Sequence, residues 1–244
     1  MGGGELVPRE EVAELVGRLS EQDLDARERG RLLARLTAAL AGGFRAAGAR
    51  AALSGRWLVD LVEQVAPHVP VRDLVTLRTH HGGLSGDELA AALVRSATVA
   101  TASVGAAGGA LAAVQHAAPP TLLAAPVQLT AETLAVVAVE LKLVAELHVV
   151  YGRAPVGTPA QVAAAYVAAW ATKRGVDAPA GVPALGVVLG VAARQQLRRR
   201  LSRRLARNVT TMAPLLTGAV AGAELNRRET RSLGEAMIGE LRGR

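Results

Sequence analysis

Three carboxylates lie in one long apolar segment, where they could bind a metal ion or form ion pairs. Glu132, Glu140 and Glu146 are set into a run of alanine, valine and leucine that ends at Val150. A metal site in a helical bundle needs Glu-x-x-His repeats on two helices. Glu146 and His148 are only two residues apart, so on a helix they point to different faces. We therefore predict no metal site and no cofactor, and we expect these carboxylates to form buried or rim ion pairs.

The remaining polar residues give no clearer signal for catalysis. Lys142 stands four residues before Glu146, which is the spacing of an ion pair along one helix. The doublet His80 and His81 adjoins a glycine-rich break, where an imidazole can cap a helix, but adjacent residues diverge on a helix and so make a poor metal site. The chain has no cysteine, which excludes disulfides and thiolate sites. No phosphate loop, dinucleotide fingerprint or nucleophile elbow is present, so we assign no catalytic residue and favour a protein that is not an enzyme.

The basic residues that exceed the acidic ones are confined to one stretch. The net charge is +7, and residues 178–223 contain no acid but seven arginines. Leu197, Leu201 and Leu205 recur at i,i+4 and predict an amphipathic helix whose opposite face is cationic. We predict that this face binds an anionic surface through Arg198, Arg199, Arg200, Arg203, Arg204 and Arg207, with Arg194 one turn earlier.

Three interpretations of this cationic stretch remain open. It is the solvated outer face of a core helix, or it meets an anionic lipid surface, where each arginine contributes about 1 kcal/mol. The third interpretation is a nucleic-acid contact. We do not expect nucleic acid, because the chain has only five aromatic residues and offers no stacking platform or recognition motif.

Glycines recur four residues apart in three uncharged segments. This spacing places both glycines on one side of a helix, where another backbone can approach closely. The pattern fits tight helix packing in an alanine-rich protein, and it also fits helical hairpins that meet or enter lipid. The predicted helix-packing positions are Gly105, Gly109, Gly186, Gly190, Gly218, Gly222 and Asn226. From Gly218 and Gly222, the i,i+4 spacing continues through Asn226 to Thr230 and Gly234, so these five residues form one ridge of a helix.

The elements that carry these residues are expected to be helices throughout. Half of the residues are hydrophobic and alanine is the commonest, while no segment shows the period-two alternation of a strand. The sequence predicts an all-α fold, a multi-helix bundle of Ala/Gly-rich close-packed helices. Glycines 82, 83 and 86, with Ser85 and Glu88 at capping-box spacing, predict a boundary between an N-terminal helical region, 1–84, and a core domain, 85–244.

Helix bounds follow from the punctuating residues. Gly42 and Gly43 are expected to end a helix that starts near Asp25. The remaining long helices are expected over residues 86–104, 121–150, 159–175 and 214–241, with a shorter helix from Ser54 to Pro67, another after Pro70, and one through the arginines.

A membrane-spanning role is less favoured than a peripheral one. Ser96 to Ala131 is a stretch of 36 residues without a charged side chain, but Pro119 and Pro120 split it and aromatic belts are missing. The N-terminal sequence MGGGELVPREE has no basic or apolar signal region. We expect a cytoplasmic location, peripheral at the inner face of the cell membrane.

The latter part of the chain resembles the EcsC family. The resemblance extends from Ser85 to Met237, and the long helix ending at Tyr151 and the helix with Trp170 belong to it. Its most specific part is the pattern of Pro214, Leu215, Leu216, Gly218, Ala219, Gly222, Asn226 and Thr230. The resemblance implies a bacterial helical protein, from a family named after an operon that also encodes an ABC transporter connected with secretion. The family has no established activity, so it supplies no catalytic residues.

Three functional hypotheses follow. The first is a non-enzymatic protein of EcsC type that binds an anionic lipid surface or a membrane protein through the arginine stretch. The second is a soluble structural or adaptor protein whose small-residue ridges bind another helix or a second copy of the chain. The third is an enzyme or carrier that holds an apolar ligand near Glu140.

Overall fold

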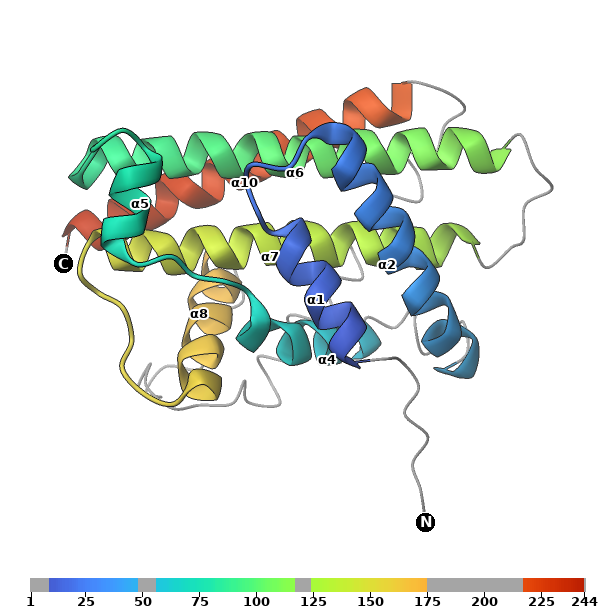
Figure 1. Ribbon diagram of the computed structural model, residues 1–244, viewed down its shortest axis with the longest axis horizontal. Coiled ribbons are helices and arrows are strands. Elements are labelled where there is room, and N and C mark those ends of the chain that lie inside the picture. The colour runs from blue at the N-terminus through green and yellow to red at the C-terminus, as the bar shows by residue number, and fades with distance from the viewer. Residues whose placement is uncertain (1–8, 48–55, 117–123, 175–216, 244) are drawn as a thin grey trace, which may run out of the picture.

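The computed structural model describes residues 9–47, 56–116, 124–174 and 217–243, and these residues form a bundle of helices without strands (Figure 1). The expected all-α, multi-helix fold class is thereby confirmed. The α-helices are α1 (Arg9–Leu19), α2 (Ala26–Ala47), α4 (Arg56–Val65), α5 (Leu74–His80), α6 (Gly86–His116), α7 (Ala124–Val150), α8 (Pro159–Lys173) and α10 (Thr217–Gly243), and one 3₁₀ turn, η1, covers Ala66–His68.

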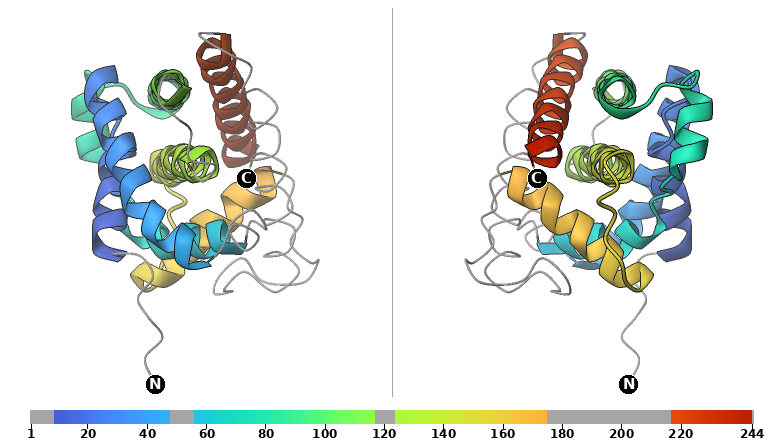
Figure 2. Two further views of the ribbon diagram at one scale, coloured as in Figure 1. Left: turned by 90° about the vertical axis from the view of Figure 1, so that its right-hand side faces the viewer. Right: turned by 90° about the vertical axis from the view of Figure 1, so that its left-hand side faces the viewer.

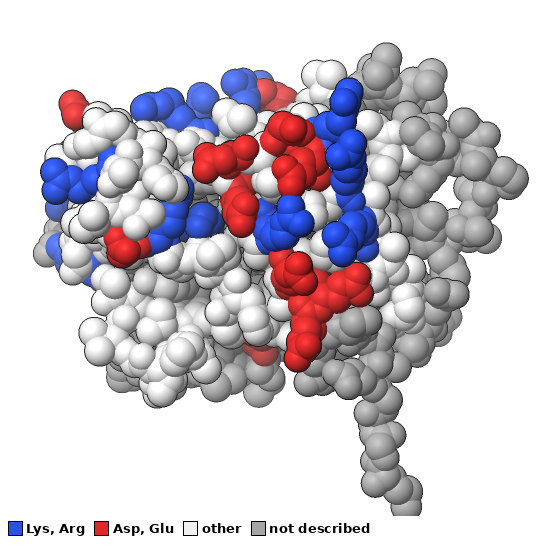
Figure 3. All heavy atoms as spheres, viewed as in Figure 1, with Lys and Arg blue, Asp and Glu red and all other residues white. Residues whose placement is uncertain are grey.

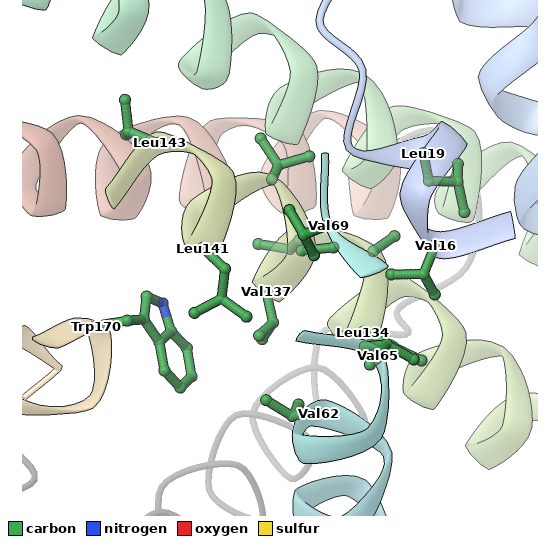
Figure 4. Close-up of a cluster of buried hydrophobic side chains, with 14 of the residues drawn as sticks. Val16, Leu19, Val62, Val65, Val69, Leu134, Val137, Leu141, Leu143 and Trp170 are labelled. Carbon is green, nitrogen blue, oxygen red and sulfur yellow. The ribbon is translucent and has the colours of Figure 1, made fainter. Parts of the chain in front are cut away.

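Helix α7 lies at the centre of the bundle, as the end-on views show (Figure 2). Helices α1, α2, α4, α6, α8 and α10 all contact it. Its sequence is apolar on every side, which is the pattern of a helix surrounded by protein. Leu134, Val137 and Leu141 of α7 point into a core that also contains Val65 of α4 and Trp170 of α8 (Figure 4).

Helix α2 is amphipathic and longer than the sequence predicts. Leu36, Leu40 and Phe44 recur at i,i+4 and are buried against the bundle. The expected end at Gly42 and Gly43 is wrong, because the helix continues to Ala47. The two glycines lie between buried Leu40 and Phe44, so burial of these side chains outweighs the roughly 1 kcal/mol that each glycine costs a helix.

Helix α6 is also longer than expected, reaching His116 instead of ending near Val104. Its glycines do not stop it, because they serve as places where neighbouring helices come close. A β-carbon on Gly105 would lie 2.8 Å from backbone atoms of Gly222 and Ala223 in α10. Glycine is therefore required at this contact by the close packing of the two helices, and it does not mark a turn.

Other helix ends follow the expected local signals. Gly82, Gly83 and Gly86 all have positive φ, which confirms the break before α6. Thr158 forms a capping box with Gln161 at the start of α8, next to Pro159 in the first turn. The cap of α5 was not predicted; there the Asp73 side chain accepts a hydrogen bond of 2.8 Å from the Thr76 amide.

Buried apolar side chains form one continuous core across the expected division at residue 84. Leu36 and Leu77 belong to the same cluster as Leu93 and Val137. Helices α1, α2 and α4 pack on α7, and α2 also packs on α6. The division into two domains stays a prediction.

One described helix contains a stretch long and apolar enough to cross a bilayer. It lies within Gly86–Leu111 of α6, and 61% of the 18-residue segment that meets this criterion is buried inside the bundle. Core helices of soluble proteins share this character, so the stretch is weak evidence for a membrane span.

Candidate functional site

The first buried charge cluster is centred on Glu146, whose side chain is inaccessible to solvent. Arg72 binds it with both arms of the guanidinium, through Nε at 2.8 Å and a terminal nitrogen at 2.9 Å. Lys142 lies 3.0 Å from the same carboxylate and also donates to the carbonyl oxygen of Pro70. The predicted i,i+4 pair of Lys142 and Glu146 is thus confirmed, and Arg72 is the partner that sequence reasoning missed.

Burial and the Glu146 charge have opposite effects on the pKa values of the two cations of this cluster. The hydrogen bond to Glu146 raises the pKa of Arg72, so the guanidinium stays charged. Burial lowers the pKa of Lys142, although the neighbouring carboxylate opposes this shift. The cluster ties α7 to the segment between η1 and α5, because Arg72 and Pro70 both come from that segment.

The histidine doublet lies beside this cluster. His80 is exposed, and its Nδ1 is 3.5 Å from a terminal nitrogen of Arg72. Burial, followed by the charge of Arg72, lowers the pKa of His81, which favours a neutral ring. The His81 amide donates to carbonyl oxygens in the last turn of α5. The doublet therefore ends a helix next to a cationic group.

The second cluster is centred on Glu140, which is also fully buried. Trp170 Nε1 of α8 donates to one carboxylate oxygen at 2.9 Å. The hydroxyl of Thr230 in α10 donates to the other oxygen at 2.9 Å, and Arg174 forms an ion pair with the same oxygen. One carboxylate of the central helix thus binds groups from two surrounding helices. Arg174 in addition lies 3.9 Å from Glu229.

Glu132, the third carboxylate, faces α6. Gln128 donates to it at 2.8 Å and also to the Gly108 carbonyl oxygen at 2.6 Å. Burial raises the pKa of Glu132 to about 7, and the hydrogen bond from Gln128 opposes this shift. A β-carbon at position 108 would collide with the Glu132 carboxylate, so the carboxylate occupies space that a glycine leaves open.

These three arrangements connect α7 to α6, α8, α10 and the segment before α5. Glu140 and Glu146 are covered by hydrogen-bond donors from neighbouring elements, and buried ion pairs of this kind favour one arrangement of helices over others. Within the described ranges, no group of three or more His, Asp or Glu side chains could hold a metal ion. His148 does not join Glu146, because its Nδ1 contacts the Val144 carbonyl and its ring packs edge-on against Tyr166.

The glycine ridge of α10 faces inward against α6. Gly222 lies at the close approach to Gly105, and Asn226 Nδ2 donates to the Thr101 carbonyl at 3.3 Å. Gly234 lies against Val94, where a β-carbon would crowd the valine methyls. Gly109 is half-buried on α6, and Gly218 stands in the first turn of α10. The pair Gly186 and Gly190 lies outside the described residues.

The cationic stretch lies wholly outside the residues that the structure describes. This applies to Arg194, Arg198, Arg199, Arg200, Arg203, Arg204 and Arg207. Their predicted role in binding an anionic surface therefore rests on the sequence alone.

A shallow hollow lies between α4, η1 and α8. Its volume is about 180 Å³, and its lining is mainly apolar, with Glu63 as the charged residue among Ala66, Pro67, Ala160, Ala163, Ala164 and Val167. Pockets for drug-sized ligands are usually about 300–1,000 Å³. This hollow does not reach that size, and its lining does not include Glu140.

Together these contacts describe a helical bundle in which Glu132, Glu140 and Glu146 of the central helix each accept hydrogen bonds from other side chains. Comparison with protein-family models, with curated proteins and with solved structures gives no match to this chain.

Proposed function

We propose that this chain is a non-enzymatic helical protein of EcsC type that binds peripherally to an anionic membrane surface, at the inner face of the cell membrane. The arginine stretch 194–207 makes the contact in this proposal, and the helical bundle serves as the body that it anchors. The family assignment rests on the sequence pattern from Pro214 to Thr230.

The distribution of charge is the observation that carries the proposal. The described residues contain 19 Lys and Arg and 19 Asp and Glu, so the described bundle is formally neutral. The whole surplus of +7 belongs to the remaining residues, chiefly the seven arginines of the stretch. A neutral body leaves no excess of carboxylates to cancel these arginines, and their charge remains for an external anionic partner.

The buried clusters support a role without catalysis. Glu140 and Glu146 have guanidinium or ammonium partners and carry hydrogen bonds that fix helix positions. A general acid or base must instead reach a substrate proton within hydrogen-bond distance. Their position supports the use of these groups in stabilising the fold.

Vesicle flotation tests the proposal. The full-length protein is mixed with vesicles of phosphatidylcholine alone or with added phosphatidylglycerol, and floated at low and high salt. We expect recovery only with anionic vesicles and a fall in recovery as salt rises, because screening weakens exposed charges. Replacing Arg199, Arg200, Arg203 and Arg204 by serine is expected to abolish recovery.

A matched control separates a local effect from a change in net charge. Arg27, Arg31, Arg35 and Arg78 are exposed on α2 and α5 of the described bundle. Replacing these four by serine removes the same total charge and is expected to leave most of the recovery intact. Equal recovery with neutral and anionic vesicles, or equal loss in both quadruple variants, would contradict the proposal.

A further inference from the structure

From Arg95 onward, the outer ridge of α6 is an exposed face without acidic residues; exposed Glu88 lies two turns before it on the same side. Arg95, Val99, Ala106 and Ala110 recur at helical spacing and are exposed, while the opposite side of the helix is buried. Val99 is 67% exposed and is one of six large apolar side chains that are exposed among the described residues. No charged residue occurs on α6 after Arg95.

The first turns of α10 lie beside the far half of α6. The two helices run antiparallel, since Gly222 packs near Gly105 while Arg242 bonds to Asp87. Val220 is 70% exposed, and no charged residue precedes Glu224 on α10. Figure 2 shows α6 and α10 together at one side of the bundle.

Basic residues flank this apolar face. Arg227, Arg228 and Arg231 are exposed on α10, about two to three turns after Val220. The nearest acid, Glu224, is bound by Arg227 at 2.7 Å and by Arg228 at 2.6 Å. These bonds lower the pKa of Glu224 to about 2, so it remains an ionised partner of the arginines. The next exposed acid on α10 is Glu235.

In the view of Figure 1, α6 lies along the upper edge of the molecule. In Figure 3, Lys and Arg atoms lie among uncharged residues along the left and middle of the upper edge, over the first half of α6, together with two small acidic patches. Larger groups of Asp and Glu atoms lie below this edge, over α1 and the first turns of α2. An anionic surface would approach the upper edge with less repulsion than the face over α1 and α2.

The cationic stretch is joined to this face by a short length of chain. Arg207 precedes Thr217, the first residue of α10, by ten residues. Even fully extended, ten residues span at most about 36 Å. A bilayer contacted by the arginine stretch is therefore within reach of the start of α10.

We propose that the exposed ridge of α6, with Val99, and the start of α10, with Val220, form the face of the bundle that lies against the anionic bilayer. Valine and alanine side chains enter the boundary between headgroups and acyl chains, and the flanking arginines bind headgroup phosphates. This inference rests on the proposed function, and it adds which side of the folded body meets the lipid.

The absence of cysteine makes a direct test possible. A single cysteine is introduced at Val99 or at Val220 in the full-length chain and labelled with the environment-sensitive fluorophore NBD. Val75 and Val156, which are 75% and 91% exposed, provide control positions away from this face. With phosphatidylglycerol vesicles, we expect a blue shift and increased emission at positions 99 and 220 and no change at the controls.

The outcomes separate this inference from the proposed function. If the protein floats with the vesicles but the NBD spectrum at 99 and 220 is unchanged, or shifts equally at the controls, the assignment of this face as the lipid contact is wrong, while the proposal of membrane binding stands. Lack of flotation overturns both. A shift that appears without vesicles as protein concentration rises means that a second copy covers the face, and this also overturns the lipid assignment.

A charge substitution gives a second measurement that does not depend on a label. Val220→Asp is expected to lower the affinity for anionic vesicles about tenfold, the factor that corresponds to losing the burial of one valine. Val75→Asp, the matched control, is expected to leave the affinity unchanged. Circular dichroism melting of both variants checks that the fold is kept, and an unchanged affinity of a folded Val220→Asp variant contradicts the inference.

Discussion

Two regions of the bundle are held together by different means. Around α7, Glu140 and Glu146 bind donors from several elements. Between α6 and α10, Gly105 and Gly222 let two backbones touch. A small-residue contact provides close packing but tolerates sliding by one turn, since similar residues recur along the ridge. Hydrogen bonds between specific side chains can form in only one alignment of the helices. The charged clusters therefore fix the helices along their axes, which the glycine contact alone does not do.

The two regions are connected through α10. Asn226 and Thr230 continue the same ridge as Gly222; Asn226 donates a hydrogen bond to the Thr101 carbonyl, and Thr230 donates one to Glu140. The ridge thus combines close approach at one end with fixed polar contacts further along. Substitutions that alter one region at a time separate the two contributions.

The largest effect is expected from breaking the Glu146 cluster. Glu146→Gln leaves Lys142 and Arg72 without their anion, and removal of one partner of a buried pair costs about 3–5 kcal/mol of unfolding free energy. Urea denaturation followed by circular dichroism measures this loss.

A double variant serves as the control for this substitution. Lys142→Met together with Glu146→Gln removes the more buried of the two uncompensated cations, so the double variant is expected to be more stable than Glu146→Gln alone. If the single and double variants unfold at the same urea concentration, the cluster does not act as an ion pair.

The glycine contact is expected to be nearly as sensitive. Gly105→Ala places a methyl group 2.8 Å from backbone atoms of α10, and backbone cannot move aside as a side chain can. Overpacking of this kind costs about 1–3 kcal/mol, and we expect the upper end of that range. Thermal unfolding of the variant measures the loss, and an unchanged melting temperature would show that α6 and α10 are not in such close contact.

Glu132 differs from Glu140 and Glu146 because it is a half-buried carboxylate without a cationic partner among the described residues. Its folded pKa, about 7, lies above the ordinary glutamate value of 4.5. The folded state therefore binds the proton more tightly than the unfolded state, and stability falls as pH rises from about 4.5 to 7. Glu132→Gln is expected to remove this slope and to raise stability at pH 8 by about 2 kcal/mol.

Urea denaturation of both proteins at several pH values between 4 and 8 tests this prediction. The curves are expected to converge near pH 4, where Glu132 is protonated in both states, and to separate above it. A constant difference across the whole range would mean that ionisation of Glu132 is not the cause.

The smallest effect is expected at a glycine outside the contact. A β-carbon on Gly239 of α10 would have no atom within 4 Å, so an added methyl meets open space. Gly239→Ala is expected to stabilise the protein by up to about 1 kcal/mol, because alanine favours the helix. A destabilisation as large as that of Gly105→Ala would show that helix α10 is sensitive at every glycine, and the contact at Gly222 would lose its special role.

Local sequence signals predicted much of the helical architecture. The apolar pattern of α7, the glycines before α6 and the start of α8 at Pro159 depend on a few neighbouring residues, and each lies where the sequence indicates. Gly42 and Gly105 show the limit of such signals, because a glycine that ends a helix and a glycine that admits a neighbouring helix look alike in one sequence. The difference lies in what packs against them.

The charged clusters were predictable only in part. Lys142 and Glu146 pair within one helix, so their spacing was sufficient. Arg72 and Arg174 are separated from Glu146 and Glu140 by 74 and 34 residues, and no periodicity connects positions so far apart. The buried position of Arg29, whose guanidinium donates to the Leu19 and Glu21 carbonyls at the end of α1, was missed for the same reason.

The docking of α10 has a consequence for biosynthesis. This helix covers α6 and supplies Thr230 to Glu140, although α7, α8 and a long further stretch of chain separate it from α6. A nascent polypeptide that has emerged only as far as α8 therefore exposes the α6 glycines and an incompletely bound carboxylate. Completion of the interior must wait until Thr217–Gly243 has left the ribosome, which makes this stage the time of greatest need for a chaperone.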